Sequence, residues 1–445
     1  MVALTDEFLI KINGSTDLHQ CQSYSGPHPE NISEIIPICY YGRSGTVFFC
    51  SLLDGHPDVI KTGAFEFREY FKYFDIMIGG GNVESQLSNC IRHYGRNMEY
   101  EGKYNQNFVE INNRLIHVPA ALDFSLDKPL DGKLFYRQPA DDDPFAYQGP
   151  YVGYVISTFM QLVETYFGNI KSTVLSEKDF FVTFNLAYNW AIDRQYAESV
   201  TKIGWNMHMP DPILAKNAQK FFPKITLVHM IRKPLQTLGS HFKRYMYPTE
   251  VEVKNDIPSH DYVNKLFTEL LSGDVPLVER RPSDDEFAIR LEDLHSTPEQ
   301  TLRKVSRRLG ISWSEVLLQS TDFGHPMAWN YSSQRGALTG FSTQHLQDDH
   351  HDLFTPDDIK FIEGVLYENY RQWDYVFSNA AAMDENIHEY VKKRIPVPLK
   401  MEIMCWEKAC QQEGAARADI MKSYGLLRDA IERRLQRKEA LLELM

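Results

Sequence analysis

A short apolar run leads directly into a loop of small residues and then into a second apolar stretch. The run covers residues 35–40, the loop residues 41–45, and the apolar stretch residues 46–53. An apolar run of this length is typical of a buried strand. Asp54-Gly55-His56-Pro57 then ends the second stretch with residues that stop helices. The sequence therefore predicts a strand, a tight loop and a helix in succession.

The loop has the composition of a phosphate-binding turn. Glycines let the backbone approach an anion closely, consecutive amide N–H groups converge on it, and the following helix adds its positive end. Arg43 adds a forked cation. The loop lacks the G-x-x-x-x-G-K-[ST] lysine of a nucleoside triphosphatase, and it is not the G-x-S-x-G elbow of a hydrolase. For this segment alone, an ordinary strand-to-helix turn is the alternative.

A second run with the length and β-branched content of a strand covers residues 225–231, and it leads into Arg232-Lys233-Pro234. Ser240 follows within a helix-like stretch from Leu235 to Tyr245. An arginine at a strand end and a hydroxyl two helical turns further on could hold one phosphate together. Taken alone, a structural arginine and a solvated serine would be the better interpretation.

Two later segments add to this pattern. Residues 287–294 predict another buried strand, and Thr297-Pro298-Glu299-Gln300 predicts a capping box at the start of a helix that ends at Gly310. Residues 334–341, Gln-Arg-Gly-Ala-Leu-Thr-Gly-Phe, form a later loop that contains one arginine and two glycines.

Together these segments resemble PAPS-dependent sulfotransferases of the soluble type. GRSGTVF followed by HPDV resembles the family's loop for the 5′-phosphosulfate of 3′-phosphoadenosine 5′-phosphosulfate (PAPS), whereas residues 225–240 and 334–341 resemble its two 3′-phosphate segments. The resemblance implies an α/β fold with a mainly parallel central sheet flanked by helices, sulfotransferase-like and P-loop-related. The cofactor-binding residues that it implies are Arg43, Ser44, Gly45, Thr46, Val47, Phe48, Arg232, Ser240, Arg335 and Gly336.

The resemblance also suggests the catalytic residues. Asn206-Met207-His208-Met209-Pro210 resembles the family's K-T-H-L-P stretch, in which the histidine is the general base, and a neutral imidazole near physiological pH suits that task. Glu66 is the competing base, because a second branch of the family uses a glutamate shortly after the first helix. His208 is favoured because it lies in a recognisable motif. Arg43 would neutralise the sulfonate and the bridging oxygen.

The amino-acid composition limits which classes of binding partner fit the chain. The chain of 445 residues has 47 Lys and Arg against 60 Asp and Glu, for a formal charge of −13. This balance argues against nucleic acid, anionic membranes and polyanionic acceptors, so a neutral or cationic small-molecule acceptor fits better. The first seven residues do not look like a secretory signal, and the six cysteines are scattered without a disulfide or zinc pattern. We expect a cytoplasmic protein that uses no metal.

The chain divides into three predicted parts. Residues 1–34 form a lead-in, residues 35–375 a sulfotransferase domain, and residues 376–445 a helical C-terminal extension. Within the domain, residues 62–203 form a helical, aromatic-rich insertion on the acceptor side, whose aromatic stripes are either pocket walls or, more plainly, helix core faces. The extension could dock onto the core or onto a second subunit, which leaves a homo-oligomer open.

The reaction implied by the resemblance moves a sulfuryl group from PAPS to a hydroxyl or amine of a small molecule, possibly in natural-product biosynthesis, and leaves adenosine 3′,5′-bisphosphate. Two alternatives stay open. Asn206, Val47 and Gln334 stand where the family usually has lysine, threonine and a basic residue, so a catalytically weak nucleotide-binding scaffold is the first. A phosphoryl-transfer enzyme of the kinase type is the second, and dependence on magnesium would favour it.

Overall fold

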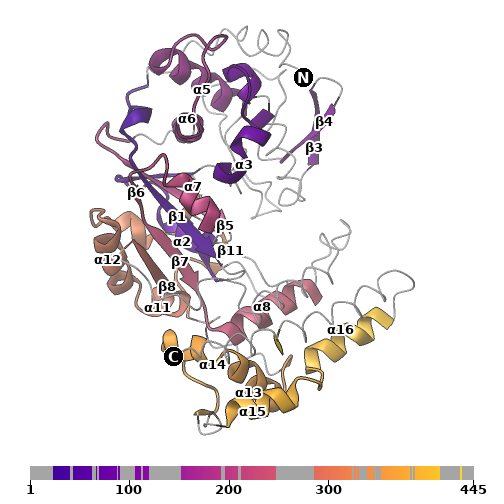
Figure 1. Ribbon diagram of the computed structural model, residues 1–445. Coiled ribbons are helices and arrows are strands. Elements are labelled where there is room, and N and C mark those ends of the chain that lie inside the picture. The colour runs from indigo at the N-terminus through magenta and orange to yellow at the C-terminus, as the bar shows by residue number, and fades with distance from the viewer. Residues whose placement is uncertain are drawn as a thin grey trace.

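The structure is a computed structural model that describes residues 24–40, 44–62, 67, 70–87, 89–90, 106–111, 114–119, 152–191, 196–208, 212–246, 285–322, 325–326, 328–329, 338–343, 346, 352–380, 383, 386–410 and 431–432. Within these ranges a parallel β-sheet forms the centre of the molecule, and helices cover both of its faces (Figure 1). The predicted fold class, an α/β fold with a mainly parallel central sheet flanked by helices, is confirmed.

Six strands make up the central sheet, and every pairing between them is parallel. Along the longest path the order is β2, β5, β1, β7, β8, and β6 pairs with the start of β1. The strands are β1 (Glu34–Tyr40), β2 (Val59–Lys61), β5 (Lys202–His208), β6 (Lys224–Ile225), β7 (Leu227–Ile231) and β8 (Glu286–Arg290).

Short antiparallel pairs and helices complete the described part of the chain. The antiparallel pairs are β3 (Gln106–Ile111) with β4 (Arg114–Pro119), β9 (Thr321–Asp322) with β10 (His325–Pro326), and β11 (Ala328–Trp329) with β12 (Leu338–Thr339). The helices are η2 (Pro29–Asn31), α2 (Thr46–Leu52), α3 (Tyr70–Met77), α5 (Val152–Tyr166), α6 (Glu177–Ala191), α7 (Pro212–Ala218), α8 (Pro234–Met246), α11 (Leu291–Ser296), α12 (Pro298–Leu309), η3 (Glu315–Leu318), α13 (Pro356–Val365), α14 (Tyr367–Gln372), α15 (Ile387–Arg394) and α16 (Lys400–Cys410). None of the described helices is long and apolar enough to cross a membrane.

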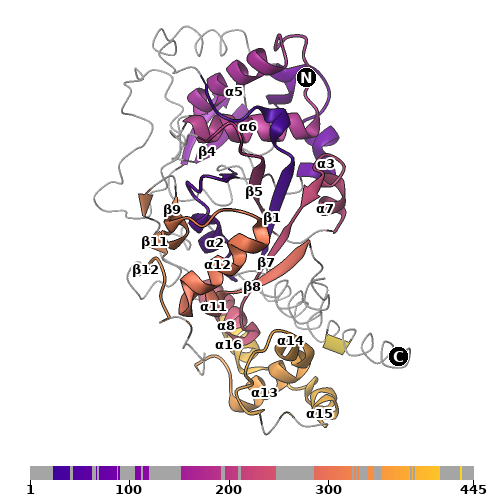
Figure 2. The same ribbon diagram turned by 90° about the vertical axis from the view of Figure 1, so that its left-hand side faces the viewer.

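Strand β1 contributes to two separate hydrophobic clusters because alternate side chains leave a strand on opposite faces. Ile35 and Cys39 join the cluster that contains α3, α5, α6 and α7. Ile36 and Ile38 join the cluster that contains α2, α11 and α12. Figure 2 shows α2, α11 and α12 on one side of the sheet and α3 and α7 on the other. Burial on both faces explains why this strand is a nearly continuous apolar run.

Several aromatic residues of the insertion form part of a buried core. Phe67, Tyr70 and Phe159 are fully buried, and the ring of Phe67 meets those of Phe181 and Phe184 at 5.3 and 5.5 Å between centroids. Trp205 of β5 closes the same cluster beneath them. These residues confirm the plainer of the two predictions, that the stripes are core faces.

The prediction of one strand over residues 287–294 is wrong at its end. Strand β8 stops at Arg290, and α11 begins at the next residue. Glu292 and Asp293 in the first turn favour a helix start, and Leu291 and Leu294 have the three-residue spacing of a buried helix face. The chain therefore turns away from the sheet four residues earlier than its apolar content suggests.

The predicted capping box at Thr297 is also absent, although the helix itself is confirmed. Thr297 both ends α11 and begins α12, and its hydroxyl donates to the carbonyl of Asp293 at 3.2 Å instead of capping α12. Helix α12 ends at Leu309, followed by Gly310 in the left-handed conformation at φ +61°, as predicted.

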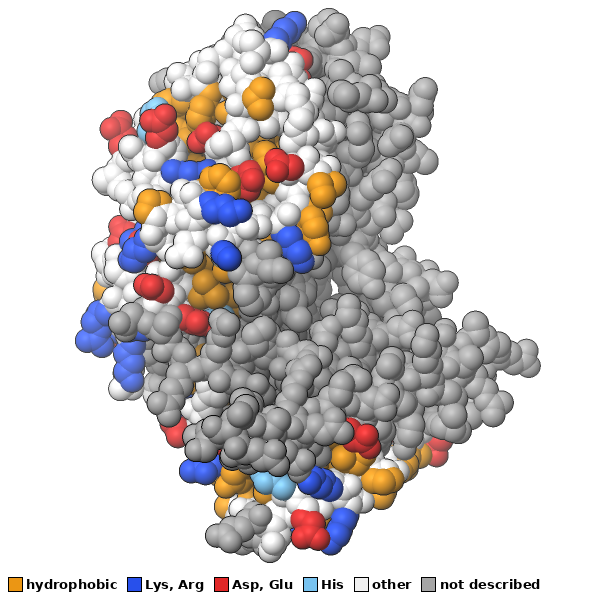
Figure 3. All heavy atoms as spheres, in the orientation of Figure 1, with side chains coloured by type: hydrophobic (Ala, Val, Ile, Leu, Met, Phe, Trp, Pro, Cys, Tyr) orange, Lys and Arg blue, Asp and Glu red, His pale blue; other side chains and the backbone are white. Residues whose placement is uncertain are grey.

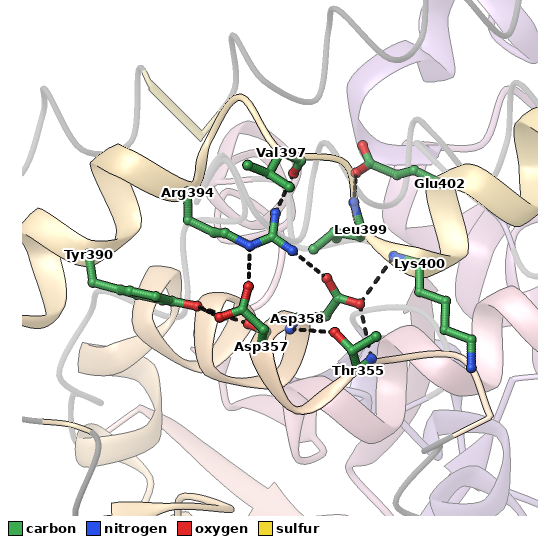
Figure 4. A network of polar contacts seen from close by, with 9 residues as sticks. All are labelled: Thr355, Asp357, Asp358, Tyr390, Arg394, Val397, Leu399, Lys400 and Glu402. Carbon is green, nitrogen blue, oxygen red and sulfur yellow. Dashed lines mark hydrogen bonds and ion pairs between the residues drawn. The ribbon is translucent and has the colours of Figure 1, made fainter.

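The described part of the C-terminal extension packs against the rest of the chain. Helices α15 and α16 share a hydrophobic cluster with α8 and α13, and Ile431 is fully buried in it. In Figure 4, Arg394 of α15 lies at the centre of the polar contacts between α13, α15 and the start of α16. Its guanidinium meets Asp357 Oδ2 at 2.5 Å and Asp358 Oδ1 at 2.8 Å, and it donates to the carbonyl of Val397 at 2.6 Å.

Arg394→Met tests whether this contact stabilises the docking of the extension. Asp358 is 1% exposed, so removing its cationic partner leaves a buried charge and should lower the free energy of unfolding by about 3–5 kcal/mol. The matched control is Arg303→Met, which breaks an exposed i,i+4 pair with Glu299 and a contact with the Trp313 ring and should cost about 1–2 kcal/mol. Chemical denaturation measures both values, and equal losses in the two variants would contradict the expectation.

Candidate functional site

The carboxyl ends of β1 and β7 lie side by side at the point where the sheet changes direction. From β1 the chain passes to β2 on one side of the sheet, whereas from β7 it passes to β8 on the other side. Tyr40 pairs with Met230, so the loop after β1 and the turn after β7 leave from neighbouring strand ends. In open α/β sheets, ligands bind outside the carboxyl ends of the strands at such a switch point.

The loop after β1 makes a tight turn into α2 at its described end. Gly45 has φ +90°, a conformation that favours glycine, and it precedes the first residue of α2. A Cβ placed on Gly45 would lie 2.4 Å from Leu291 Cδ1, because α11 approaches the loop closely. Thr46 is 2% exposed, and its hydroxyl has no hydrogen-bond partner among the described residues. A buried hydroxyl without a protein partner suits a bound anionic oxygen.

The side chains of Phe48 and Val47 on α2 differ in their exposure to solvent. The Phe48 ring is buried and stacks on the His295 ring, with centroids 4.5 Å apart and an angle of 13° between planes. The Phe341 ring meets Phe48 edge-on at 5.3 Å. Val47 is exposed. The Phe48 side chain therefore anchors α2 to α11 and to the end of the segment 334–341.

The far end of α2 is held by a second set of polar contacts. The buried His56 ring bridges two backbone groups: Nε2 lies 3.2 Å from the carbonyl of Ser312, and Nδ1 accepts the Asp58 amide at 3.1 Å. Burial lowers the pKa of His56, which keeps the imidazole neutral in this bridge. The Asp58 carboxylate in turn accepts the Ser312 amide and hydroxyl at 2.7 and 2.6 Å. Both ends of the short helix are thus fixed.

The turn after β7 carries Arg232 and Lys233 into α8. Both residues are half-buried, and Ser240 lies two helical turns along α8, also half-buried. The Lys233 amide donates to Glu292 Oε1 at 2.7 Å, so the turn is tied to the first turn of α11. The predicted strand, arginine and helical serine therefore occur in the expected order.

The backbone of His208 ends β5 and pairs with Cys39 of β1, next to the same edge of the sheet. The register shifts by one residue between Ile38 and Cys39, because Met207 is an extra residue in β5. Such irregularities are common beside functional sites. The remaining predicted site residues, Arg43, Glu66, Arg335 and Gly336, lie outside the described residues.

Sequence reasoning missed two contributions to this region. Leu291 packs against Gly45, and Glu292 accepts the Lys233 amide. The prediction placed both residues inside a strand, whereas the acidic pair Glu292 and Asp293 was a signal for the first turn of a helix. In the described part of the chain, no group of three or more His, Cys, Asp or Glu could hold a metal ion.

Charged side chains of both signs are intermingled over the described surface that Figure 3 shows. The four basic residues Arg303, Lys304, Arg307 and Arg308 are exposed on α12, and Arg303 is paired with Glu299 at 2.8 Å. The acidic balance of the whole chain is therefore not uniform over its surface.

Comparison with known proteins gives matches only among solved structures. No protein family model and no curated protein matches the sequence. A sulfotransferase domain from the curacin biosynthetic pathway is 11% identical over 81% of this chain and 97% of its own, with a TM-score of 0.33. A sulfotransferase domain from a Synechococcus olefin synthase is 13% identical over 84% and 97%, with a TM-score of 0.31. A sulfotransferase from Mycobacterium avium is 12% identical over 83% and 81%, with a TM-score of 0.32. We take no residue role from these similarities.

Gly45→Ala tests whether the loop geometry depends on glycine. The added methyl group meets both the left-handed backbone and Leu291, so the free energy of unfolding should fall by about 2–4 kcal/mol. Gly310→Ala is the matched control, because Gly310 also has positive φ but no atom within 4 Å of its added Cβ, and about 1–2 kcal/mol is expected. Leu291→Ala removes core packing by itself, so Gly45→Ala is also measured in a Leu291→Ala background, where it should cost only the backbone part, about 1–2 kcal/mol. Equal losses at the two glycines would rule out the close approach of Leu291.

Proposed function

We propose that the protein transfers a sulfuryl group from PAPS to a hydroxyl or amine of a small-molecule acceptor. The observation that carries this proposal is the side-by-side placement of the ends of β1 and β7 at the switch point of the sheet. One end leads to Gly45 and Thr46, and the other leads to Arg232 and, along α8, to Ser240. Two phosphate-type groups of one nucleotide suit two such neighbouring turns.

The first turn would hold the 5′-phosphosulfate. The unpartnered Thr46 hydroxyl and the tight Gly45 backbone fit an anion there, and amide groups of residues 44–48 would bind it. Since Phe48 is buried, its contribution would come from its backbone and from anchoring α2. Arg43 would balance the charge that develops on the bridging oxygen as the S–O bond breaks. The resemblance to the sulfotransferase loop, which lacks the P-loop lysine, favours sulfuryl over phosphoryl transfer.

The second turn would hold the 3′-phosphate. Arg232 and Ser240 would bind it from β7 and α8, and Arg335 with the Gly336 amide would bind it from the segment 334–341. Phe341, at the end of that segment, packs on Phe48 of α2. This contact supports the assignment of the later loop to the same nucleotide.

The acceptor proton would pass to His208. The acceptor oxygen or nitrogen attacks sulfur, the S–O bond to the nucleotide breaks, and adenosine 3′,5′-bisphosphate leaves with the electron pair. The His208 imidazole takes the proton from the acceptor, and its backbone position beside β1 supports this role. Glu66 is the alternative base. A neutral or cationic acceptor, cytoplasmic location and a C-terminal homo-oligomer contact remain parts of the proposal, as does a role in natural-product biosynthesis.

Nucleotide binding separates the proposed enzyme from a kinase. Adenosine 3′,5′-bisphosphate should raise the melting temperature without magnesium, by linkage, whereas ATP with magnesium should leave it unchanged. Sulfur-labelled PAPS and a pool of small hydroxyl and amine metabolites should then yield a labelled product in the presence of EDTA. Stabilisation by magnesium-ATP alone would indicate phosphoryl transfer, and binding of the bisphosphate without any turnover would indicate the scaffold.

His208→Ala and Glu66→Ala distinguish the two candidate bases. Loss of a general base typically lowers the rate by about 10²- to 10⁴-fold, and we expect this loss in the His208 variant with the affinity for the bisphosphate unchanged. Single-turnover rates with labelled PAPS measure the effect. His388→Gln on α15, outside the candidate site, is the control histidine and should keep the wild-type rate. Full activity in both the His208 and Glu66 variants would remove both residues from the chemistry.

A further inference from the structure

We propose that Glu292 is a positioning residue for the turn that carries Arg232, and that Glu363 completes the arrangement through the Lys233 side chain. We name these contacts the Lys233 clamp; it comprises Lys233, Glu292 and Glu363. This inference rests on the proposed function, in which Arg232 binds the 3′-phosphate. Neither acid touches the reacting atoms in this account.

The backbone half of the clamp joins two neighbouring strand ends. Ile231 and Arg290 form the last pair between β7 and β8. Just beyond it, the Lys233 amide donates to Glu292 Oε1 at 2.7 Å. The Lys233 carbonyl at the same time accepts the amides of Gln236 and Thr237, each at 3.0 Å, which starts α8. Both backbone groups of Lys233 are therefore fixed.

The side-chain half of the clamp reaches the helices beyond the sheet. Lys233 Nζ lies 4.0 Å from Glu363 Oε1, and Glu363 of α13 is fully buried. The Glu363 carboxylate accepts the Ser378 amide at 3.0 Å and the Ser378 hydroxyl at 2.8 Å. Glu292 Oε2 accepts the Tyr375 hydroxyl at 3.4 Å. Both acids thus link the turn to the segment that follows α14.

The clamp changes how an anion can bind at this turn. The first amides of a helix have no partner within the helix and commonly bind phosphate. Here the Lys233 amide is already occupied by a carboxylate. Pro234 has no N–H, and the Gln236 and Thr237 amides donate to the Lys233 carbonyl. Binding of a phosphate at this turn therefore falls mainly to side chains, and Arg232 and Ser240 are the candidates. Since side-chain binding depends on where the turn holds Arg232, fixing the turn at Lys233 sets the geometry of the 3′-phosphate contact.

Calorimetric titration of two nucleotides tests the clamp. Adenosine 3′,5′-bisphosphate and adenosine 5′-monophosphate differ only in the 3′-phosphate. A residue that positions Arg232 should therefore change the affinity for the bisphosphate and leave the affinity for the monophosphate unchanged. We expect Glu292→Ala to lower the affinity for the bisphosphate by roughly tenfold, the size expected for one charge-assisted hydrogen bond. The affinity for the monophosphate should not change. Glu292→Gln should restore most of the affinity, because its amide oxygen can still accept the Lys233 amide. Asp293→Ala, the adjacent exposed acid, is the matched control and should match the wild type.

Hydrogen exchange at the Lys233 amide supplies a readout that needs no ligand. It should be slow in the wild type and in Glu292→Gln, and much faster in Glu292→Ala. Equal weakening of both nucleotides, or unchanged exchange in Glu292→Ala, would overturn the clamp. If the wild type binds the two nucleotides with equal affinity, the proposed function fails instead. In that case, faster exchange of the Lys233 amide in Glu292→Ala than in the wild type would still support Glu292 as the residue that fixes the turn.

Discussion

The parallel pairing of β1 with β7 is the constraint on which the candidate site depends. Each strand is followed by a turn and a helix, and the register from Ile38 with Val228 to Tyr40 with Met230 brings the two turns out at one edge of the sheet. From β1 the chain passes to β2 on one side of this point, and from β7 it passes to β8 on the other side. Two turns that lie far apart in the sequence therefore become neighbours.

Hydrophobic burial holds that pairing in place from both sides. Ile36 and Ile38 face the cluster of α2, α11 and α12, whereas Ile35 and Cys39 face the cluster of α3, α5, α6 and α7. A third cluster joins α8, which follows the Arg232 turn, to the C-terminal helices. Through Glu292 and Glu363, the Lys233 clamp connects α11 of the first of these clusters with α13 of the third. The helices beyond α13 are therefore coupled to the turn that carries Arg232.

The sequence was sufficient for the elements in which local signals agree. The apolar run before the glycine loop and the helix that ends at Gly310 occur within about a residue of the prediction. The strand predicted over residues 225–231 is instead two strands, β6 (Lys224–Ile225) and β7 (Leu227–Ile231). It was insufficient where tertiary contacts decide. Residues 291–294 were predicted as strand but form a helix against Gly45. The Thr297 hydroxyl donates to the Asp293 carbonyl of α11 instead of capping α12. No local pattern could show that Glu292 would meet the Lys233 amide, because the two residues lie far apart in the chain.

A crystal structure with adenosine 3′,5′-bisphosphate tests the central claim most directly. The account predicts the 5′-phosphate at the amides of Gly45 and Thr46 and the 3′-phosphate at Arg232 and Ser240, with one nucleotide bridging the ends of β1 and β7. A nucleotide bound away from this edge of the sheet, or Arg43, Arg232 and Arg335 directed to separate surfaces, would contradict it.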